Sequence, residues 1–370
     1  MKPHSGLKHS SDAAGRSHVF GVCSWNHSSV RALFHDSRGA PEFHNDFASA
    51  LRSARQTGGQ IVAWASRFTK VHQDLCSAAN VPVVRVEDGF VRSIGLGAGY
   101  VPAASLAVDQ RGIYYDSATP SDIEHDLQTL ALSSSHEQIG AQIRSLIVNA
   151  RLSKYNLANS STEFALPIDR PVVLVPGQVS TDASITRMIS QTIDLEFNEC
   201  INQQLLRLAR TAYPEAFIVY RPHPDVLAQL RRGNVPAAQA MRYADAISGG
   251  GDILPLIERC DRVVTISSLA GFEALLRNKP VTVHGSPFYA GWGLTDDQSL
   301  LPQRSTRRTV DELTFVAFER YTKHIDPFTG CQCNIKQLIA SLVRLRDSAI
   351  HRFRISMLLR VARLIDRGRE

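Results

Sequence analysis

Short apolar runs alternate with helical patterns along this 370-residue chain, and this alternation constrains the fold more than any other feature. In the first part of the chain the apolar runs predict strands at Val19–Val22, Gln60–Ala65 and Val81–Val86. The predicted helices of this part are Phe43–Arg55, Val71–Ala79, Asp122–Ser133 and Glu137–Leu152. Strands that alternate with helices in this way favour a parallel sheet with helices on both faces.

The same alternation starts again near Pro167. The predicted strands of this second part are Pro171–Val175, Phe217–Tyr220, Arg262–Ile266 and Val281–His284. The predicted helices are Ile189–Ala212, Ile253–Arg259 and Leu269–Arg277. Two domains are also the usual expectation at about 100–200 residues each. We therefore predict an α/β, GT-B-like fold, in which two Rossmann-like domains face each other across a cleft, with an added C-terminal helix.

Four segments follow from this division. Residues 1–17 are polar and lack periodicity, so we expect them to be disordered. Residues 18–165 would form the N-terminal Rossmann-like domain, and residues 166–335 the C-terminal Rossmann-like domain. Residues 336–370 would form a basic amphipathic helix.

The C-terminal segment also explains the net charge of +6 that the whole chain carries. Residues 336–370 alone hold nine Lys and Arg and three Asp and Glu, a net charge of +6, so the rest of the chain is neutral. A neutral body gives no reason to expect nucleic acid as a partner. We expect 336–350 to pack on the first domain and 351–370 to lie on an anionic membrane surface.

Two simpler features bound the location and the chemistry. No apolar run reaches the roughly 18 residues of a membrane span, and the N-terminus lacks the apolar region of a secretory signal. We therefore expect a cytoplasmic protein, peripheral to the inner face of the cytoplasmic membrane. The six cysteines show no metal-binding spacing, so we expect free thiols and no metal.

Polar motifs follow several of the predicted strands, where open α/β sheets bind their ligands. The first motif, Glu87-Asp88-Gly89, places two carboxylates at a strand end. Either could act as a general acid or base, and the alternative is a surface turn. Arg92 and the glycine-rich stretch after it are interpreted as a loop that lines the cleft.

The second motif brings Gln178, Asp182 and Ser184 to the end of the next domain's first strand. Asp182 could be a nucleophile, or it could simply cap the following helix. In the third motif, Pro222 and Pro224 stiffen a loop that carries Arg221 and His223. That pair could neutralise a phosphate or a carboxylate.

The fourth motif is a strand, a hydroxyl-rich turn and a helix. Ser267 and Ser268 lie where a helix N-terminus can bind a phosphate, and Glu273 could hold ribose hydroxyls, although the serines would cap the helix even without a ligand. In the fifth motif, Tyr289 and Trp292 lie among glycines, where they could stack on a base or a sugar or cover a domain edge.

Taken together, these stretches resemble the capsule polysaccharide biosynthesis family of the KpsC type. The resemblance covers about residues 18–335, and its blocks appear in order along the chain: Glu87–Ser93, Arg111–Asp116, Val175–Gln178 with Asp182–Ser184, Arg221–Asp225, Ser267–Glu273, Pro287–Gly293 and Asp326–Gly330. Proteins of this type are retaining β-Kdo transferases that use CMP-Kdo. They usually carry two such modules in tandem, whereas the motif set occurs once in this sequence.

The resemblance implies that residues 18–165 form the acceptor-side domain and residues 166–335 the nucleotide domain that binds CMP. It also implies a role for each motif. Glu87, beside Asp88, would activate the acceptor hydroxyl, and Asp182 would attack the anomeric carbon. The residues expected to bind the CMP-sugar donor are Arg92, Gln178, Ser184, Arg221, His223, Pro224, Ser267, Ser268 and Glu273. The residues expected to line the acceptor site are Tyr289 and Trp292.

The implied reaction transfers Kdo to a lipid-linked Kdo acceptor in capsule primer synthesis, without a metal or another cofactor. Capsule assembly and export proteins are the expected partners. Two alternatives stay open. One is a transferase of the same fold that uses CMP-sialic acid or a UDP-sugar. The other is a non-enzymatic assembly or export factor, in which the side chains of Glu87, Asp182 and His223 would not converge.

Overall fold

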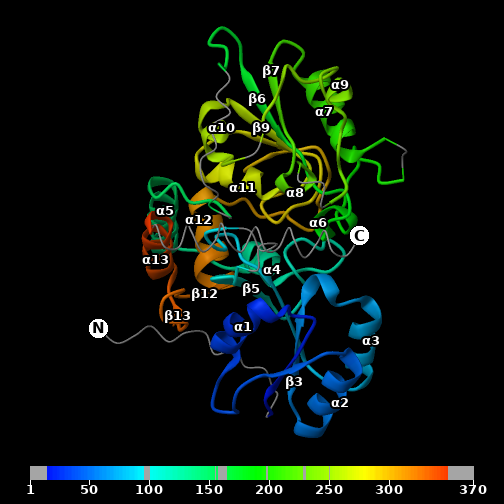
Figure 1. Ribbon diagram of the computed structural model, residues 1–370, viewed down its shortest axis with the longest axis vertical. Helices are drawn as coiled ribbons and strands as arrows, with labels where there is room; N and C mark the ends of the chain where they lie inside the picture. The colour runs from blue at the N-terminus through cyan, green and yellow to red at the C-terminus, as the bar shows by residue number, and fades with distance from the viewer. Residues whose placement is uncertain are drawn as a thin grey trace.

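The described residues form two sheets, one in each domain, and Figure 1 shows the second domain above the first. The computed structural model describes residues 15–95, 101–154, 156, 165–196, 199–227, 231–249 and 251–348. The prediction of a disordered start falls almost wholly on residues 1–14, and these lie outside the described residues. Residues 351–370, predicted to meet a membrane, also lie outside them.

The first sheet has seven strands in the order β13-β12-β5-β4-β3-β1-β2. They are β1 (Ser17–Phe20), β2 (Glu42–His44), β3 (Gln60–Trp64), β4 (Val83–Asp88), β5 (Ser105–Asp109), β12 (Thr322–Ile325) and β13 (Gln332–Cys333). β1, β3 and β4 run parallel as the alternation predicts. β2 is also parallel to β1, although the sequence pattern predicts a helix from Phe43, and the helix α2 begins only at Phe47. β5 is antiparallel to β4, and β12 is antiparallel to β5. The sheet is therefore mixed.

Alternate residues of β3 show how the sheet is covered on both faces. Val62 packs in one core with Val30 of α1 (His27–Phe34). Ile61 and Ala63 point to the other face and pack with α2 (Phe47–Thr57) and α3 (Lys70–Ala78). A strand whose two faces are both buried needs apolar residues at every position, and this explains the unbroken apolar run in the sequence.

The second sheet is wholly parallel, with the order β11-β10-β9-β6-β7-β8. Its strands are β6 (Val172–Pro176), β7 (Phe217–Arg221), β8 (Ala246–Ile247), β9 (Arg262–Thr265), β10 (Val281–Val283) and β11 (Asp296–Asp297). Its helices are α6 (Ala183–Thr186), α7 (Ile201–Ala212), α8 (Pro224–Leu227), α9 (Ala237–Ala240), α10 (Leu254–Arg259) and α11 (Leu269–Leu276). Two α/β domains with facing sheets confirm the predicted fold class.

One predicted helix of this domain is about half its expected length. The pattern predicts a helix from Ile189, but α7 begins at Ile201. In the stretch before it, the Ser190 hydroxyl donates to the His284 carbonyl at 2.6 Å, and the Thr192 hydroxyl lies 2.9 Å from His284 Nδ1. Hydroxyl side chains that bond outside the segment compete with helix formation, so this part of the prediction is wrong.

The predicted end of the second domain at residue 335 is also wrong, because the chain returns to the first domain earlier. α12 (Val310–Phe315), a π-helical turn (Val316–Tyr321), β12 and β13 all pack on that domain. Two contacts hold this returning segment on the first domain. Arg144 of α5 (Ser134–Asn149) pairs with Asp311 at 2.6 Å, and the Tyr321 hydroxyl donates to Asp109 at 2.8 Å. β5 pairs with β4 on one side, and β12 of this returning segment covers its other edge.

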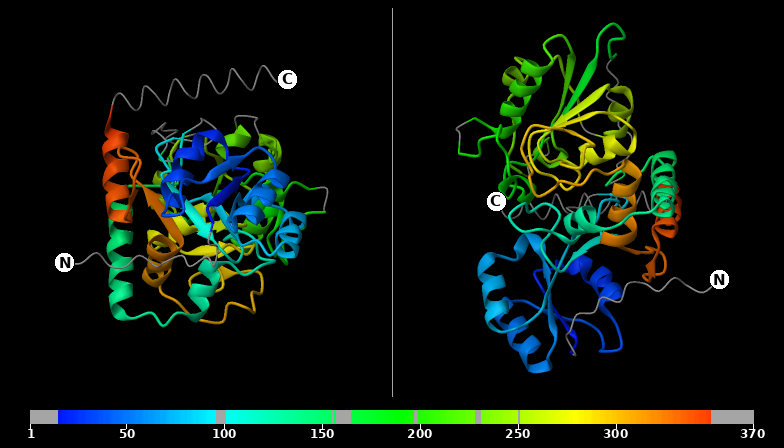
Figure 2. Two further views of the ribbon diagram at one scale, coloured as in Figure 1. Left: turned by 90° about the horizontal axis from the view of Figure 1, so that it is seen from below. Right: turned by 180° about the vertical axis from the view of Figure 1, so that it is seen from behind.

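The helix predicted for 336–350 does pack on the first domain. α13 (Ile335–Asp347) lies beside α5, as Figure 2 shows, and it buries Leu338, Ile339 and Leu342. The Arg346 guanidinium donates to the carbonyl of Ala150 at 2.7 Å. Within the described residues, no helix has both the length and the apolar character that crossing a membrane requires.

A buried ion pair joins the two domains. Arg304 Nε, from the loop after β11, donates to Glu124 Oε1 of α4 (Asp122–Thr129) at 3.0 Å, and both side chains are almost fully buried. Removing one partner leaves the other charge buried, which costs about 3–5 kcal/mol. Glu124→Ala is therefore expected to lower the free energy of unfolding by this amount in urea denaturation.

The exposed Lys70–Asp74 pair provides the matched control, since its atoms are 3.7 Å apart on the surface. Asp74→Ala is expected to change stability by less than about 0.5 kcal/mol. Equal effects of the two substitutions would contradict the assignment of the buried pair as a link between domains.

Candidate active site

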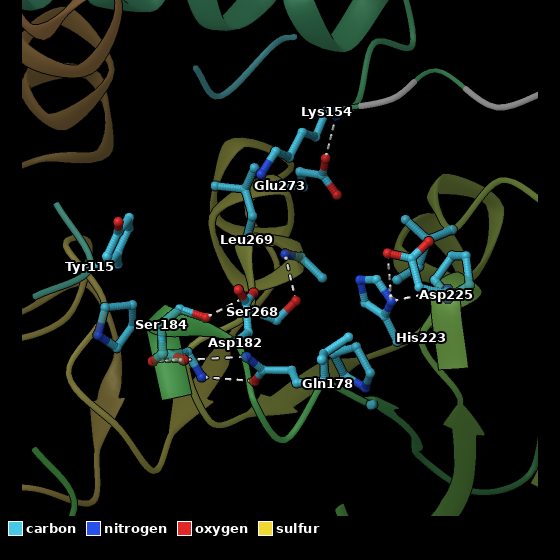
Figure 3. Close-up of a pocket in the computed structure, with 18 of the residues that line it drawn as sticks. Tyr115, Lys154, Gln178, Asp182, Ser184, His223, Asp225, Ser268, Leu269 and Glu273 are labelled. Atoms are coloured by element: carbon cyan, nitrogen blue, oxygen red, sulfur yellow. Dashed lines mark hydrogen bonds and ion pairs between the residues drawn. The ribbon is translucent and has the colours of Figure 1, made fainter. Parts of the chain in front are cut away.

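A cavity of about 390 Å³ opens between the two sheets. It lies at the carboxyl ends of β4, β6, β7 and β9, and residues of both domains line it. Figure 3 shows side chains of the second domain together with Tyr115 and Lys154 of the first. This is the edge at which open parallel sheets bind ligands, because the loops that follow the strands gather there.

Most of the residues predicted from the sequence line this one cavity. They are Glu87, Asp88, Gln178, Asp182, Ser184, Arg221, His223, Pro224, Ser267, Ser268, Glu273 and Tyr289. The convergence of Glu87, Asp182 and His223 is the opposite of what the non-enzymatic alternative predicts.

Arg92 does not line the cavity, so the prediction that it contacts the donor is wrong. Its side chain is 1% exposed. Its Nε lies 2.8 Å from Asp88 Oδ1, and its other nitrogens donate to Ser93 and to the carbonyl of Val101 at 2.8 and 2.9 Å. A guanidinium this deeply buried must have partners inside the protein, so it holds Asp88 and the following loop in place.

The prediction that Trp292 lines the acceptor site is also wrong. Its ring is fully buried, its Nε1 donates to the Phe288 carbonyl at 2.8 Å, and the Arg304 guanidinium lies over it at 5.8 Å. It is therefore part of the core at the domain edge and cannot stack on a sugar.

Tyr289 lines the cavity, but its ring is also buried and its hydroxyl donates to the Ser268 carbonyl at 2.5 Å. The ring lies so close to α11 that a Cβ on Gly271 would stand 2.3 Å from the Tyr289 hydroxyl oxygen. The glycine in this motif is therefore a packing requirement, and Tyr289 positions the turn before α11.

Glu87 is the last but one residue of β4, and its carboxylate faces the cavity. Its Oε2 accepts hydrogen bonds from the Ser66 backbone N–H and the Tyr115 hydroxyl, each at 3.3 Å. Burial, and then the neighbouring Asp88 charge, raise the pKa of Glu87 to about 7. A carboxyl group with this pKa can exchange protons with a substrate near neutral pH.

Asp182 caps a helix, which is one of the two interpretations of its motif, and it also borders the cavity. It is the N-cap of α6, with Oδ1 accepting from the Ala183 N–H at 3.0 Å and Oδ2 accepting weakly from the Ser184 hydroxyl at 3.4 Å. The side chain is nevertheless half exposed and borders the cavity. The cap holds the carboxylate in one orientation toward the cavity without burying it.

His223 lies at the start of α8, across the cavity (Figure 3). The Asp225 backbone N–H donates to His223 Nδ1 at 3.2 Å, so a neutral imidazole must carry its proton on Nε2. Burial lowers the pKa of His223, and the nearby carboxylates of Asp225 and Asp182 oppose that shift. The ring therefore offers an N–H donor in either protonation state.

Arg221 has a different role from the one its sequence motif suggests. Its guanidinium donates to the Ser248 hydroxyl at 3.0 Å and to the carbonyls of Gly249 and Gly251. These bonds hold the loop between β8 and α10, whose residues Gly251 and Asp252 line the cavity. Arg221 shapes the cavity wall mainly through this loop.

The N-terminus of α11 opens onto the cavity through Ser267, Ser268 and Leu269. Gln178 fixes this turn, because its Oε1 accepts from the Ser267 N–H at 2.9 Å and its Nε2 donates to the Ser267 hydroxyl at 3.2 Å. Ser268 caps the helix by accepting from the Ala270 N–H at 3.2 Å. The helix dipole therefore favours an anion at this wall.

Lys154, Tyr114, Tyr115 and Asp225 also line the cavity, and sequence reasoning gave none of them a role. The Lys154 backbone N–H donates to Glu273 Oε1 at 2.9 Å, and burial raises the pKa of Glu273 to about 7. Lys154 follows a predicted helix, and no predicted strand or glycine-rich turn next to it marks it as a site residue. The packing of the two domains brings it to the cavity. Tyr114 and Tyr115 belong to the block Arg111–Asp116, and this block was the sequence feature that could have indicated them as cavity residues.

Comparisons with known proteins agree with this geometry. The model of the family described as "Capsule polysaccharide biosynthesis protein" matches residues 60–331, which is most of the chain. The chain belongs to the capsule polysaccharide biosynthesis family. The matched region of this family member contains all the residues that line the cavity.

Curated relatives support the membership. The family member is 36% identical over 329 residues to the lipopolysaccharide-processing protein LpsZ of Rhizobium meliloti, covering 88% of this chain and 73% of LpsZ. It is 34% identical over 340 residues to the capsule polysaccharide modification protein LipA of Neisseria meningitidis serogroup B, covering 90% of this chain and 46% of LipA. The chain therefore spans about half the length of LipA.

Solved structures with the same fold come from KpsC of Thermosulfurimonas dismutans. The structure titled β-Kdo 2,4 transferase aligns with a TM-score of 0.75 and 28% identity, over 89% of this chain and 98% of that one. The structure titled β-Kdo 2,7 transferase aligns with a TM-score of 0.69 and 27% identity, over 90% of this chain and 100% of that one. Both likenesses cover the two domains of this family member together.

Proposed function

We propose that this protein is a retaining β-Kdo transferase that moves Kdo from CMP-Kdo to a lipid-linked Kdo acceptor in capsule primer synthesis. The observation that carries the proposal is the convergence of Glu87, Asp182 and His223 on one cavity beside a helix N-terminus. The likeness to the KpsC β-Kdo transferases supports the choice of sugar.

The donor half of the cavity suits a sugar nucleotide with a single phosphate. The N-terminus of α11, the hydroxyls of Ser267 and Ser268 and the Nε2–H of His223 would surround the phosphate. These groups stabilise the charge that develops on the phosphate as the sugar leaves, so we propose a step that needs no metal. Glu273, whose pKa is raised to about 7, would accept hydrogen bonds from ribose hydroxyls.

The reaction would run through two displacements at the anomeric carbon. In the first, the Asp182 carboxylate attacks that carbon, and the bond to the phosphate oxygen breaks with its electron pair leaving on CMP. In the second, Glu87 takes the proton of the acceptor hydroxyl, the hydroxyl oxygen attacks the same carbon, and Asp182 departs. Two inversions give net retention.

The acceptor is a lipid-linked glycan, so the enzyme would work at the inner face of the cytoplasmic membrane beside capsule assembly and export proteins.

Turnover with a panel of donors tests the proposal directly. Purified protein is incubated with a Kdo-primed lipid and CMP-Kdo, CMP-sialic acid or a UDP-sugar, and nucleotide release and product are measured. We expect turnover with CMP-Kdo alone and a product in which the β configuration is kept. Turnover only with another donor, or none with several Kdo-primed acceptors, would overturn the proposal.

Nucleotide binding gives a second prediction that does not need the acceptor. Because a ligand that binds only the native state raises the melting temperature, CMP is expected to raise Tm more than UDP at equal concentration. At 100 times Kd the gain is about 2.7 kcal/mol of apparent stability. Equal shifts with CMP and UDP would contradict a cavity selective for cytidine.

A further inference from the structure

Two histidines and a glutamate form a compact cluster at the edge of the first sheet, away from the cavity. His18 belongs to β1, and Glu42 and His44 belong to the neighbouring strand β2. The strands are parallel, with His18 paired to Glu42 and Phe20 paired to His44. Glu42 and His44 are two residues apart, so their side chains leave the same face of β2.

The distances within the cluster match those of ligands around one ion. His18 Nδ1 lies 3.1 Å from His44 Nε2 and 3.6 Å from Glu42 Oε2, and His44 Nε2 lies 3.9 Å from Glu42 Oε1. Ligand atoms bind Zn²⁺ at about 2.0–2.2 Å, so two of them can be no more than about 4.4 Å apart. Among the described residues, this cluster alone brings three such side chains this close.

The hydrogen bonds around His18 give it the tautomer that a metal ligand needs. The Thr57 hydroxyl donates to the Ser53 carbonyl at 2.9 Å, so its oxygen is able to accept from His18 Nε2–H, also at 2.9 Å. With the proton on Nε2, the lone pair of Nδ1 points toward His44.

We propose that His18, Glu42 and His44 bind a divalent transition-metal ion such as Zn²⁺. Two imidazole nitrogens and one carboxylate form a usual three-residue ligand set for this ion. The Glu42 side chain is 50% exposed, so water can supply the fourth ligand. The charge of exposed Arg16 opposes a cation here, and the Glu42 carboxylate offsets it.

The consequence of binding is structural. β2 has three residues and, within the described part of the chain, pairs with β1 alone at the edge of the sheet. An ion held by both strands would tie this edge to the sheet, and Thr57 would extend the link to α2. The site is independent of the transferase chemistry, so its test does not rely on activity.

The test is a titration of the full chain, freed of metal by a chelator, with Zn²⁺ and separately with Co²⁺. Calorimetry, Tm and the visible spectrum of bound Co²⁺ are the readouts. We expect binding at micromolar concentrations or tighter and a rise in Tm. His44→Ala and Glu42→Gln are each expected to weaken the affinity at least about 10-fold, and Thr57→Val about 10-fold.

His125→Ala is the matched control, because His125 is an exposed histidine of α4 whose removal should leave the affinity unchanged. Glu42→Gln changes an exposed side chain and should fold normally, so a lost signal in that variant reports on the site. Equal affinity of the parent chain and the His44→Ala and Glu42→Gln variants, or a Tm that Zn²⁺ does not change, would overturn the proposal.

Discussion

Asp182→Asn is expected to lower kcat of Kdo transfer by about 10⁴-fold or more while CMP still binds with nearly unchanged affinity. An amide cannot attack the anomeric carbon, and losing a covalent nucleophile is among the most costly single changes in an enzyme. Asn is nevertheless as good an N-cap as Asp. The substitution therefore removes the proposed chemistry and keeps the cap that Asp182 provides to the Ala183 N–H.

Steady-state turnover and CMP binding by calorimetry check this prediction together. Ser184→Ala is the control, since it removes a weak hydrogen bond of 3.4 Å to the same carboxylate and leaves the carboxylate itself in place. We expect that control to lower kcat less than about 10-fold, the size of effect that one weak hydrogen bond can carry. If Asp182→Asn retains more than a tenth of the parent turnover, the carboxylate is a cap and the nucleophile lies elsewhere.

A trapping experiment separates the nucleophile from other roles of this carboxylate. When Glu87 is replaced by Gln, the second displacement should slow more than the first, because only the second needs a base. Mass spectrometry of Glu87→Gln with CMP-Kdo is then expected to show Kdo attached to the peptide that contains Asp182. An adduct on another carboxylate would move the assignment to that residue.

The outline of the fold follows from local sequence patterns, and its exceptions have physical causes. Fully apolar runs such as Val172–Pro176 are buried on both faces, and this makes them easy to recognise. β12 has no such pattern, since it contains Lys323 and His324 and forms only because β5 offers it an antiparallel edge. The crossing of residues 310–347 back to the first domain depends on that pairing, which no local pattern encodes.

The candidate site was predictable where chemistry follows a strand directly. Gln178 and His223 lie just after strands of the second sheet, so its parallel topology brings them together. Glu87 lies at the end of β4 in the first sheet, and the packing of the two domains places it on the same cavity. Arg92 follows the Glu87 motif and Trp292 lies in the fifth motif. The sequence does not say which side chains of such loops are buried. Buried hydrogen bonds to neighbouring side chains and carbonyls decided those two positions.

Glu87→Gln is expected to lower kcat about 10²–10⁴-fold, which is the usual contribution of a general base. The pH profile makes the prediction specific. The pKa of Glu87 is raised to about 7 by burial and by Asp88, so the carboxylate that accepts the proton is lost as pH falls below 7. The kcat/KM of the parent enzyme should fall about tenfold per pH unit there, and the residual activity of Glu87→Gln should lack this dependence.

Tyr115→Phe provides the matched variant. The Tyr115 hydroxyl donates to Glu87 Oε2 at 3.3 Å, and a donor to a carboxylate favours its charged form. Without this donor the pKa of Glu87 should rise, so the acid side of the kcat/KM profile should move to higher pH. An unshifted profile in Tyr115→Phe, together with an unchanged one in Glu87→Gln, would assign the base to another group.

Stability should change in the opposite direction from activity. Because the pKa of Glu87 is raised in the native state, the native protein binds more protons than the unfolded chain between about pH 4.5 and 7. Glu87 therefore reduces the free energy of unfolding as pH rises through this window, and by pH 8 it leaves a charge in a buried position. Glu87→Gln removes that charge, so it should be more stable than the parent at pH 8 and lose this advantage near pH 4.

Urea denaturation at the two pH values measures the difference. Glu273 titrates in the same range and is present in both proteins, so it cancels from the comparison. A variant that is inactive yet more stable at pH 8 would identify Glu87 as a group held in a costly state for catalysis, whereas lower stability at both pH values would indicate a structural role.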